Sequence, residues 1–200
     1  MEATQKISTG ILTIPVFLLK EYSMRVLLEG LLPRIFPDLR FLCVHHEGKQ
    51  DLEKSIPRKL RAWREPGVIF VVLRDKDLSD CYDLKRRLVT LCREGNREDT
   101  LVRIACQELE AWYLGEPAAL AAAFEDPRLL DIGGRARYRD PDAVVRPSAE
   151  VEALIPAFQK VSGARRMAMH LTRERNCSRS FQVLLGGIDR LSEVLQARGT

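Results

Sequence analysis

Short apolar runs alternate with amphipathic stretches along the first 125 residues of the chain. The apolar runs fall at residues 14–20, 40–46, 68–73 and 101–106. They contain many β-branched residues, which is typical of strands buried in a sheet. Between and after these runs, leucine and other apolar residues recur with the period of a helix that buries one face. The predicted helices fall at residues 23–35, 52–63, 84–91, 108–114 and 118–124.

The order of these elements predicts an α/β fold with a mostly parallel sheet of about four strands and helices on both faces. Residues 1–125 form this predicted core. Residues 126–147 contain Gly-Gly, Asp-Pro-Asp and Arg-Pro and are predicted to be a surface excursion. Residues 148–200 are expected to form a C-terminal helical extension that packs on the core. Ser23 and either Ser79 or Asp80 are the expected N-caps of the first and third helices.

The composition, with 46% hydrophobic and 30% charged residues, is that of a soluble globular protein. No run approaches the roughly 18 consecutive apolar residues of a membrane helix, so we expect a cytoplasmic protein with no membrane partner. The five cysteines are scattered and lack a zinc-binding spacing, which favours reduced and mostly buried thiols.

The net charge of +4 is too small to indicate a nucleic-acid partner, but the arginines are clustered in the sequence. Five of them fall within fifteen positions, namely Arg165, Arg166, Arg173, Arg175 and Arg179. A solvated helix face would explain such a run. The alternative interpretation is a patch that binds the phosphates of a nucleic acid.

Acidic residues follow three of the four predicted strands. Glu21 follows the first strand, Asp75 and Asp77 follow the third, and Glu108 and Glu110 follow the fourth. The carboxyl ends of parallel strands share one edge of the sheet, where ligand sites of this fold class form. Side chains two positions apart on an extended segment point to the same side, so Asp75 and Asp77 could share one Mg²⁺, which prefers oxygen ligands. The alternative is that each acidic residue is solvated or caps a helix.

The acidic residues also carry a resemblance to a known fold. Glu21 after the first strand and Asp75-Lys-Asp77 after the third resemble the TOPRIM fold of topoisomerases, bacterial primases, recombination-repair proteins and overcoming-lysogenization-defect (OLD) nucleases. The stretch from Ile104 to Gly115, which contains Glu-Leu-Glu-Ala-Trp, resembles more narrowly a bacterial TOPRIM-like family. Gly48-Lys-Gln-Asp and Tyr138-Arg-Asp-Pro-Asp also recur in that family, so the resemblance covers nearly the whole chain.

This resemblance implies a nuclease that uses Mg²⁺ or Mn²⁺ to cleave phosphodiester bonds, with DNA favoured over RNA. It implies Glu21 as general acid/base or metal ligand, Asp75 and Asp77 as catalytic metal ligands, and Glu108 or Glu110 as the residue that completes the site. Members of the family occur beside genes for AAA or SMC-like ATPases in anti-phage defence. The resemblance therefore also implies an ATPase partner, and it leaves a homo-oligomer open.

Two alternative functions remain at this point. TOPRIM sequences have Gly where this chain has Tyr22, which favours a catalytically weak module that binds nucleic acid or the partner ATPase. The same carboxylates could instead serve phosphotransfer on a nucleotide, although the chain has no GxxxxGK[ST] loop. Lys49, in the turn after the second strand, could neutralise a phosphate or could be a solvated lysine.

Overall fold

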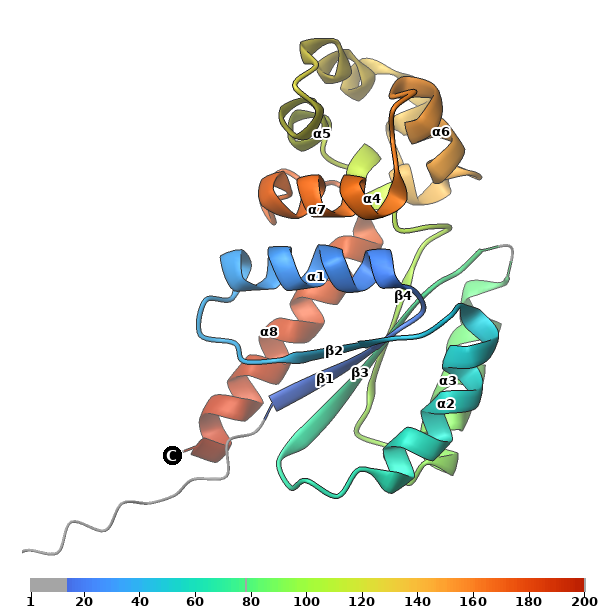
Figure 1. Ribbon diagram of the computed structural model, residues 1–200, viewed down its shortest axis with the longest axis vertical. Coiled ribbons are helices and arrows are strands. Elements are labelled where there is room, and N and C mark those ends of the chain that lie inside the picture. Colours follow the sequence, from blue (N-terminus) through green and yellow to red (C-terminus); the bar gives the residue numbers. More distant parts are fainter. Residues whose placement is uncertain (1–13, 78, 200) are drawn as a thin grey trace, which may run out of the picture.

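A four-stranded parallel sheet forms the centre of the protein, seen in a computed structural model that describes residues 14–77 and 79–199. The strands are β1 (Ile14–Leu19), β2 (Leu42–His45), β3 (Val68–Asp75) and β4 (Leu101–Ala105). Their order across the sheet is β2-β1-β3-β4, and every pairing is parallel (Figure 1). The predicted α/β class and the parallel arrangement are therefore confirmed.

Helices cover both faces of the sheet, as the sequence predicts (Figure 1). Helix α1 (Tyr22–Ile35) packs on one face, and α2 (Lys49–Ala62) and α3 (Cys81–Glu94) pack on the other. In β3, Val71 and Leu73 join the core on the α1 face, whereas Phe70 and Val72 face α2 and α3. Because side chains alternate along a strand, Arg74 points towards α2 and α3, and Asp75 points towards α1 on the opposite face.

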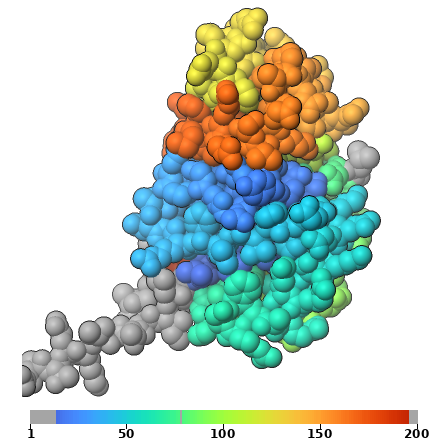
Figure 2. All heavy atoms as spheres, viewed as in Figure 1, coloured from blue at the N-terminus to red at the C-terminus, as the bar shows by residue number. Residues whose placement is uncertain are grey.

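A layer of helices lies over α1 on the side away from the sheet (Figures 1 and 2). It contains α4 (Ala111–Leu114), α5 (Pro117–Phe124), α6 (Pro147–Leu154) and α7 (Lys160–His170). Helix α7 packs along α1, and the long helix α8 (Arg179–Gly199) crosses β4. Fully buried Trp112 and Phe181 join this layer to the core of the sheet. No helix in the described ranges has the length and apolar character needed to cross a membrane.

Residues 126–147 lie mostly at the surface, but a few of their side chains are buried in the core. They form three short 3₁₀ helices, η1 (Pro127–Gly134), η2 (Ala136–Tyr138) and η3 (Pro141–Ala143). Leu129, Ile132 and Tyr138 from this segment belong to the main hydrophobic core. Leu129 and Ile132 are three positions apart, but two residues are too few to establish a helical period, so the sequence pattern does not reveal their burial.

Two expected helix caps have different outcomes. Asp80 caps α3, because its carboxylate accepts hydrogen bonds from the backbone N–H groups of Tyr82 and Asp83. Ser23 does not cap α1, because the helix already begins at Tyr22 and Glu21 occupies the N-cap position. The Ser23 hydroxyl instead donates a hydrogen bond to Glu21 Oε1 at 2.6 Å, which orients this carboxylate.

Candidate metal centre at the carboxyl edge of the sheet

Asp75 and Asp77 do share a cation, and in this structure the cation is the ammonium group of Lys20. Lys20 Nζ lies 3.0 Å from Asp75 Oδ2 and 2.9 Å from Asp77 Oδ1. Burial alone would lower the pKa of Lys20, but the charge of Asp75 and the hydrogen bonds to both carboxylates raise it well above its usual range. Lys20 is therefore a firmly charged partner of the acidic pair.

A turn, not a continuing strand, brings Asp77 next to Asp75. Strand β3 ends at Asp75, and Asp77 has a left-handed backbone with φ of 52°. Asp tolerates this conformation better than most residues because its short polar side chain can bond locally. The Asp77 amide donates to the carbonyl of Gln107 at 2.9 Å, which holds the turn against the chain that follows β4. The expected closeness is present, but extended geometry is not its cause.

Asp75 lies deep in the α1 face of the sheet edge and is only 2% exposed. Burial raises the pKa of its carboxyl group to about 8, although the charge of Lys20 opposes this shift and the charges of Glu21 and Glu110 add to it. Its second oxygen, Oδ1, has no hydrogen-bond partner among the described residues. A buried oxygen without a partner is costly, so this atom is suited to a ligand that supplies positive charge.

Glu110 is a second buried carboxylate of the same kind, with 1% of its surface exposed. Burial raises its pKa to about 7, Lys160 favours the ionised form, and Glu21 and Glu108 disfavour it. Its Oε2 atom and the Tyr113 hydroxyl both lack a hydrogen-bond partner within the described part of the chain. The pKa of Tyr113 is raised first by burial and then by the charges of Glu110, Glu21 and Asp75, so all four groups border one region.

Lys160, at the first position of α7, brings a second positive charge to this region. Burial would lower its pKa, but Glu110 first, and then Glu21 and Glu108, raise it. The α1 side of the site therefore contains carboxylates from the ends of β1, β3 and β4, and an ammonium group contributed by the helical layer. Such a mixture of carboxylates and lysines can bind a metal ion together with an anionic substrate.

Glu108 has a structural role that separates it from Glu110. Its Oε2 accepts a hydrogen bond of 2.8 Å from the backbone N–H of Ser148, in the first turn of α6. A carboxylate at a helix N-terminus satisfies an otherwise unpaired amide and interacts favourably with the helix dipole. The cap accounts for Glu108, whereas Glu110 is left with an oxygen that has no partner in the described ranges.

The side chains present can supply oxygen ligands to Mg²⁺, but they are not assembled into a finished site. Within residues 14–77 and 79–199, no group of three or more His, Cys, Asp or Glu side chains is arranged to hold a metal ion. The buried Asp75 Oδ1 and Glu110 Oε2 atoms nevertheless fit the chemistry of a hard divalent cation. A metal could bind if Lys20 released Asp75 and the neighbouring carboxylates adjusted their side-chain angles.

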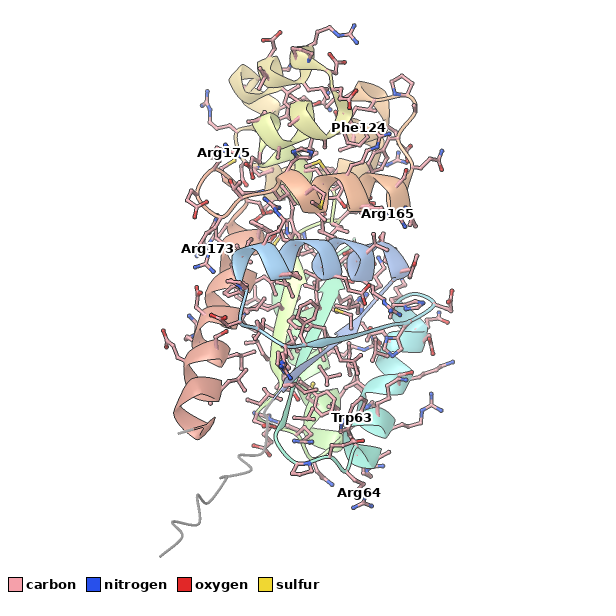
Figure 3. All side chains as sticks on the ribbon, turned by 60° about the vertical axis from the view of Figure 1, so that its left-hand side comes forward. Trp63, Arg64, Phe124, Arg165, Arg173 and Arg175 are labelled. Carbon is pink, nitrogen blue, oxygen red and sulfur yellow. The ribbon has the colours of Figure 1, made fainter. Side chains whose placement is uncertain are left out.

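The predicted nucleic-acid contacts fall into separate places. Lys49 is the first residue of α2 and lines a polar pocket on the α2 and α3 face of the sheet. Arg165 is exposed on α7, and the neighbouring Arg166 stacks over the Phe124 ring at 5.6 Å. Figure 3 shows Arg165 on the opposite side of the helical layer from Arg173 and Arg175. The arginines therefore do not form one continuous patch.

Arg173 and Arg175 have partners within the protein. Arg173 Nη2 lies 2.9 Å from Asp189 Oδ1, and its guanidinium group stacks over the Phe36 ring at 5.0 Å. Arg175 Nε lies 2.9 Å from Oε1 of the buried Glu116. These contacts join the segment after α7 to α8, α1 and α5, and they give both arginines a structural role.

Tyr22, at the position where the resemblance to TOPRIM sequences predicts a glycine, does not pack towards the buried carboxylates. Its ring is 45% exposed and packs against His45 of β2, with ring centroids 5.1 Å apart. Strand β2 lies on the opposite side of β1 from β3, so the ring extends away from Asp75.

Sequence patterns did not identify Lys20, Lys160 or Tyr113 as parts of the site. Lys20 is the polar residue directly after a buried strand, and that position could have been a signal. The positions of Lys160 and Tyr113 at the site depend on how the helical layer folds back over α1. The hydrophobic periods of their helices do not predict that arrangement.

The fold and the buried acidic edge define an α/β protein with a candidate oxygen-ligand site at the carboxyl ends of its strands. The chain belongs to the family described as "Domain of unknown function (DUF4276)", which matches residues 21–189. The structure is similar to that of the C-terminal region of the Burkholderia pseudomallei OLD protein, with a TM-score of 0.57 and 15% sequence identity. The similarity covers 92% of this chain and 98% of that chain, and at this identity it shows a shared fold. No curated protein matches the sequence.

Proposed function

We propose that this protein is a TOPRIM-like nuclease that uses Mg²⁺, or Mn²⁺ in its place, to cleave the phosphodiester bonds of a nucleic acid. The observation that carries the proposal is the buried pair Asp75 and Glu110, each with an oxygen that lacks a partner in the described part of the chain. The fold shared with the C-terminal region of the OLD protein supports it.

Asp75 and Glu110 would hold the metal ion, with Glu21 nearby as a further ligand or as the general acid/base. When bound, the metal would polarise the phosphate and activate a water molecule. Asp77, which is more exposed than Asp75, remains the proposed fourth carboxylate. Glu108 is the least suited of the predicted ligands because it caps α6.

The two lysines have proposed roles that differ from those of the carboxylates. Lys20 and Lys160 would bind oxygens of the substrate phosphate and offset the negative charge that develops during cleavage. Lys20 would have to exchange at least one of its two carboxylate contacts for the substrate.

The wider setting rests on the resemblance of the sequence to the TOPRIM-like family. We propose DNA as the substrate, a role in anti-phage defence in the cytoplasm, and an AAA or SMC-like ATPase as the partner that controls cleavage. Copurification of the protein with the product of an adjacent ATPase gene would test the partnership.

Cleavage of plasmid and single-stranded DNA in Mg²⁺ or Mn²⁺ tests the nuclease. We expect Asp75→Asn and Glu110→Gln each to lower the cleavage rate at least about 100-fold, since each removes a proposed metal ligand. Glu98→Gln is the control, because Glu98 is exposed in the loop before β4. If Asp75→Asn and Glu110→Gln both cleave as fast as the control, the nuclease does not use this site.

The contact of Lys20 with both aspartates favours a second candidate, a module that binds nucleic acid or an ATPase without cleaving. In that case Lys20 permanently neutralises the acidic pair and no metal is needed. Salt-dependent DNA binding that is unchanged by EDTA, with no cleavage in Mg²⁺ or Mn²⁺, would support this module over the nuclease.

A further inference from the structure

A polar pocket of about 350 Å³ lies on the face of the sheet opposite the buried carboxylates. Three basic side chains line it, together with the carboxylates of Glu53 and Asp83. The basic residues are Lys49 of α2, Arg74 of β3 and Arg87 of α3. Arg74 connects the pocket to the acidic edge, because its Nη2 atom lies 3.9 Å from Asp77 Oδ2. The pocket is therefore next to the proposed nuclease site but is made by different side chains.

Arg74 is the buried base of this pocket. The residue is 3% exposed, and its Nε atom has no hydrogen-bond partner among the residues described. Its Nη1 pairs with Glu53, which also accepts Arg87 Nη2 at 2.5 Å. One carboxylate thus holds two guanidinium groups side by side, and Arg87 keeps 69% of its side chain exposed for a further ligand.

The N-terminus of α2 adds a second source of positive charge. Gly48 occupies the N-cap position and has no side chain to cap the helix, while Asp51 in the first turn accepts a hydrogen bond from the Glu47 amide just before the helix. Helix α3 differs, because the carboxylate of Asp80 already accepts from its first turn. Unpaired amides and the helix dipole make the start of α2 favourable for an anion, and Lys49 and Gln50 lie there.

We propose that this pocket binds a phosphate group of a nucleotide chain while the neighbouring phosphate occupies the acidic edge. Guanidinium groups match the geometry of phosphate oxygens, and Lys49 adds a point charge at the helix N-terminus. The proposal rests on the proposed nuclease function for the identity of its ligand. The shared chemistry is a phosphate group, which can come from the backbone of the chain or from its 5′ end.

Fluorescence anisotropy of a labelled DNA oligonucleotide in EDTA tests this pocket without cleavage. We expect the double variant Lys49→Ala/Arg87→Ala to bind at least about tenfold more weakly and to show a smaller dependence on salt. The matched control is Lys54→Ala/Arg93→Ala, which removes the same charges from exposed positions on the same two helices. Equal affinities of the two double variants would overturn the proposal.

Two further arms identify the source of the phosphate. A 5′-phosphorylated oligonucleotide that binds more tightly than its 5′-hydroxyl counterpart assigns the pocket to the end of the chain. Equal binding of the two, with the loss still confined to Lys49→Ala/Arg87→Ala, assigns it to the backbone. Inorganic phosphate should compete for the parent protein, and failure to compete at concentrations that saturate free phosphate sites counts against the pocket.

The binding test of the pocket and the cleavage test of the nuclease can succeed or fail independently. Pocket-dependent binding by a protein that never cleaves would retain the pocket and reject the nuclease. If cleavage depends on Asp75 and Glu110 but DNA affinity is unchanged by Lys49→Ala/Arg87→Ala, the nuclease proposal is retained and the pocket proposal is rejected.

Discussion

Among the residues that the structure describes, buried carboxylates occur in two regions, and they differ in whether all their oxygens have hydrogen-bond partners. In the helical layer, Glu116 is 1% exposed and accepts hydrogen bonds from the Thr172 amide, the Thr172 hydroxyl and Arg175. At the sheet edge, Asp75 and Glu110 are equally buried, but each keeps an oxygen without a partner in the described ranges. The residue types and the burial are the same, so the difference lies in the partners.

This contrast separates structural acids from functional ones. A buried carboxylate with a full set of donors stabilises its ionised form and holds segments together. A buried carboxylate without them is costly to ionise, and proteins retain such groups where a ligand compensates them. The comparison therefore gives Glu116 a role in stability and supports the proposal that Asp75 and Glu110 bind a ligand.

The largest expected change in stability comes from removing Glu116, the buried carboxylate that has a full set of hydrogen-bond donors. Glu116→Ala should lower the free energy of unfolding by about 3 kcal/mol, because it leaves the Thr172 amide and Arg175 without their acceptor. Urea denaturation measures the change. Glu116→Gln retains an acceptor and should cost less, so an equal loss for Ala and Gln would contradict the assigned role.

Removing the charge of Glu110, which has an oxygen without a partner in the described ranges, should increase stability instead of lowering it. Without metal, Glu110→Gln should raise the free energy of unfolding at pH 8 by about 2 kcal/mol, because it removes a charge that is costly to bury. The pKa of Glu110 is raised from 4.5 to about 7, so the folded state binds this proton more tightly. The stabilisation from the protonated acid is present below pH 4.5 and is lost as the pH rises through 7.

The gain from Glu110→Gln should therefore disappear at pH 4, and urea denaturation at both pH values checks this. Glu98→Gln, at an exposed position, serves as the control and should show little change at either pH. A loss of stability for Glu110→Gln at pH 8 would place Glu110 among the satisfied acids.

The stabilisation of the protein by Mg²⁺ should also depend on pH, because it depends on the protonation of Asp75 and Glu110, and it should be a smaller effect. Protons and Mg²⁺ compete for Asp75 and Glu110, whose pKa values are raised to about 8 and about 7. At a Mg²⁺ concentration tenfold above Kd, we expect about 1.4 kcal/mol of stabilisation at pH 8 and much less at pH 5. Thermal unfolding with and without Mg²⁺ measures it, and a shift that is independent of pH would argue against these two ligands.

The smallest expected effect distinguishes two arginines of the same sequence cluster. Arg173→Ala should cost about 1 kcal/mol of stability, since it removes the contacts with Asp189 and the Phe36 ring. Arg165→Ala should leave stability within about 0.5 kcal/mol because the side chain is exposed. Arg165→Ala should weaken DNA binding if this arginine contacts phosphates, and the same loss from Arg173→Ala in a fully folded protein would reverse the assignment.

The sequence predicted the sheet well because its strands are encoded locally. Each strand is a short and mostly apolar run, and alternation with helical periods was sufficient to predict parallel pairing. The sheet edge followed from the same information, since Asp75 lies at a strand end. The burial of Leu129 and Ile132 was missed because the neighbouring Gly133-Gly134 favoured a surface loop for this segment.

The details of the site depend on contacts that are distant in the sequence. Lys20 reaches Asp75 only because β1 pairs with β3 in the register that places Leu19 beside Leu73. Glu108 differs from Glu110 because α6 returns from 40 positions away to take its carboxylate as a cap. No local pattern contains these partners, so the sequence alone left Glu108 and Glu110 equivalent.

The position of α8 has a consequence for how the protein is made. All four strands have been synthesised by residue 105, but Phe181, Leu184, Leu185 and Ile188 of α8 are fully buried parts of the same core. A growing chain folds from its N-terminus, so the apolar surface of β4 that α8 covers stays exposed until the ribosome has synthesised some 80 further residues. During that interval the exposed apolar surface makes the incomplete chain prone to aggregation, and α8 is the segment that covers it.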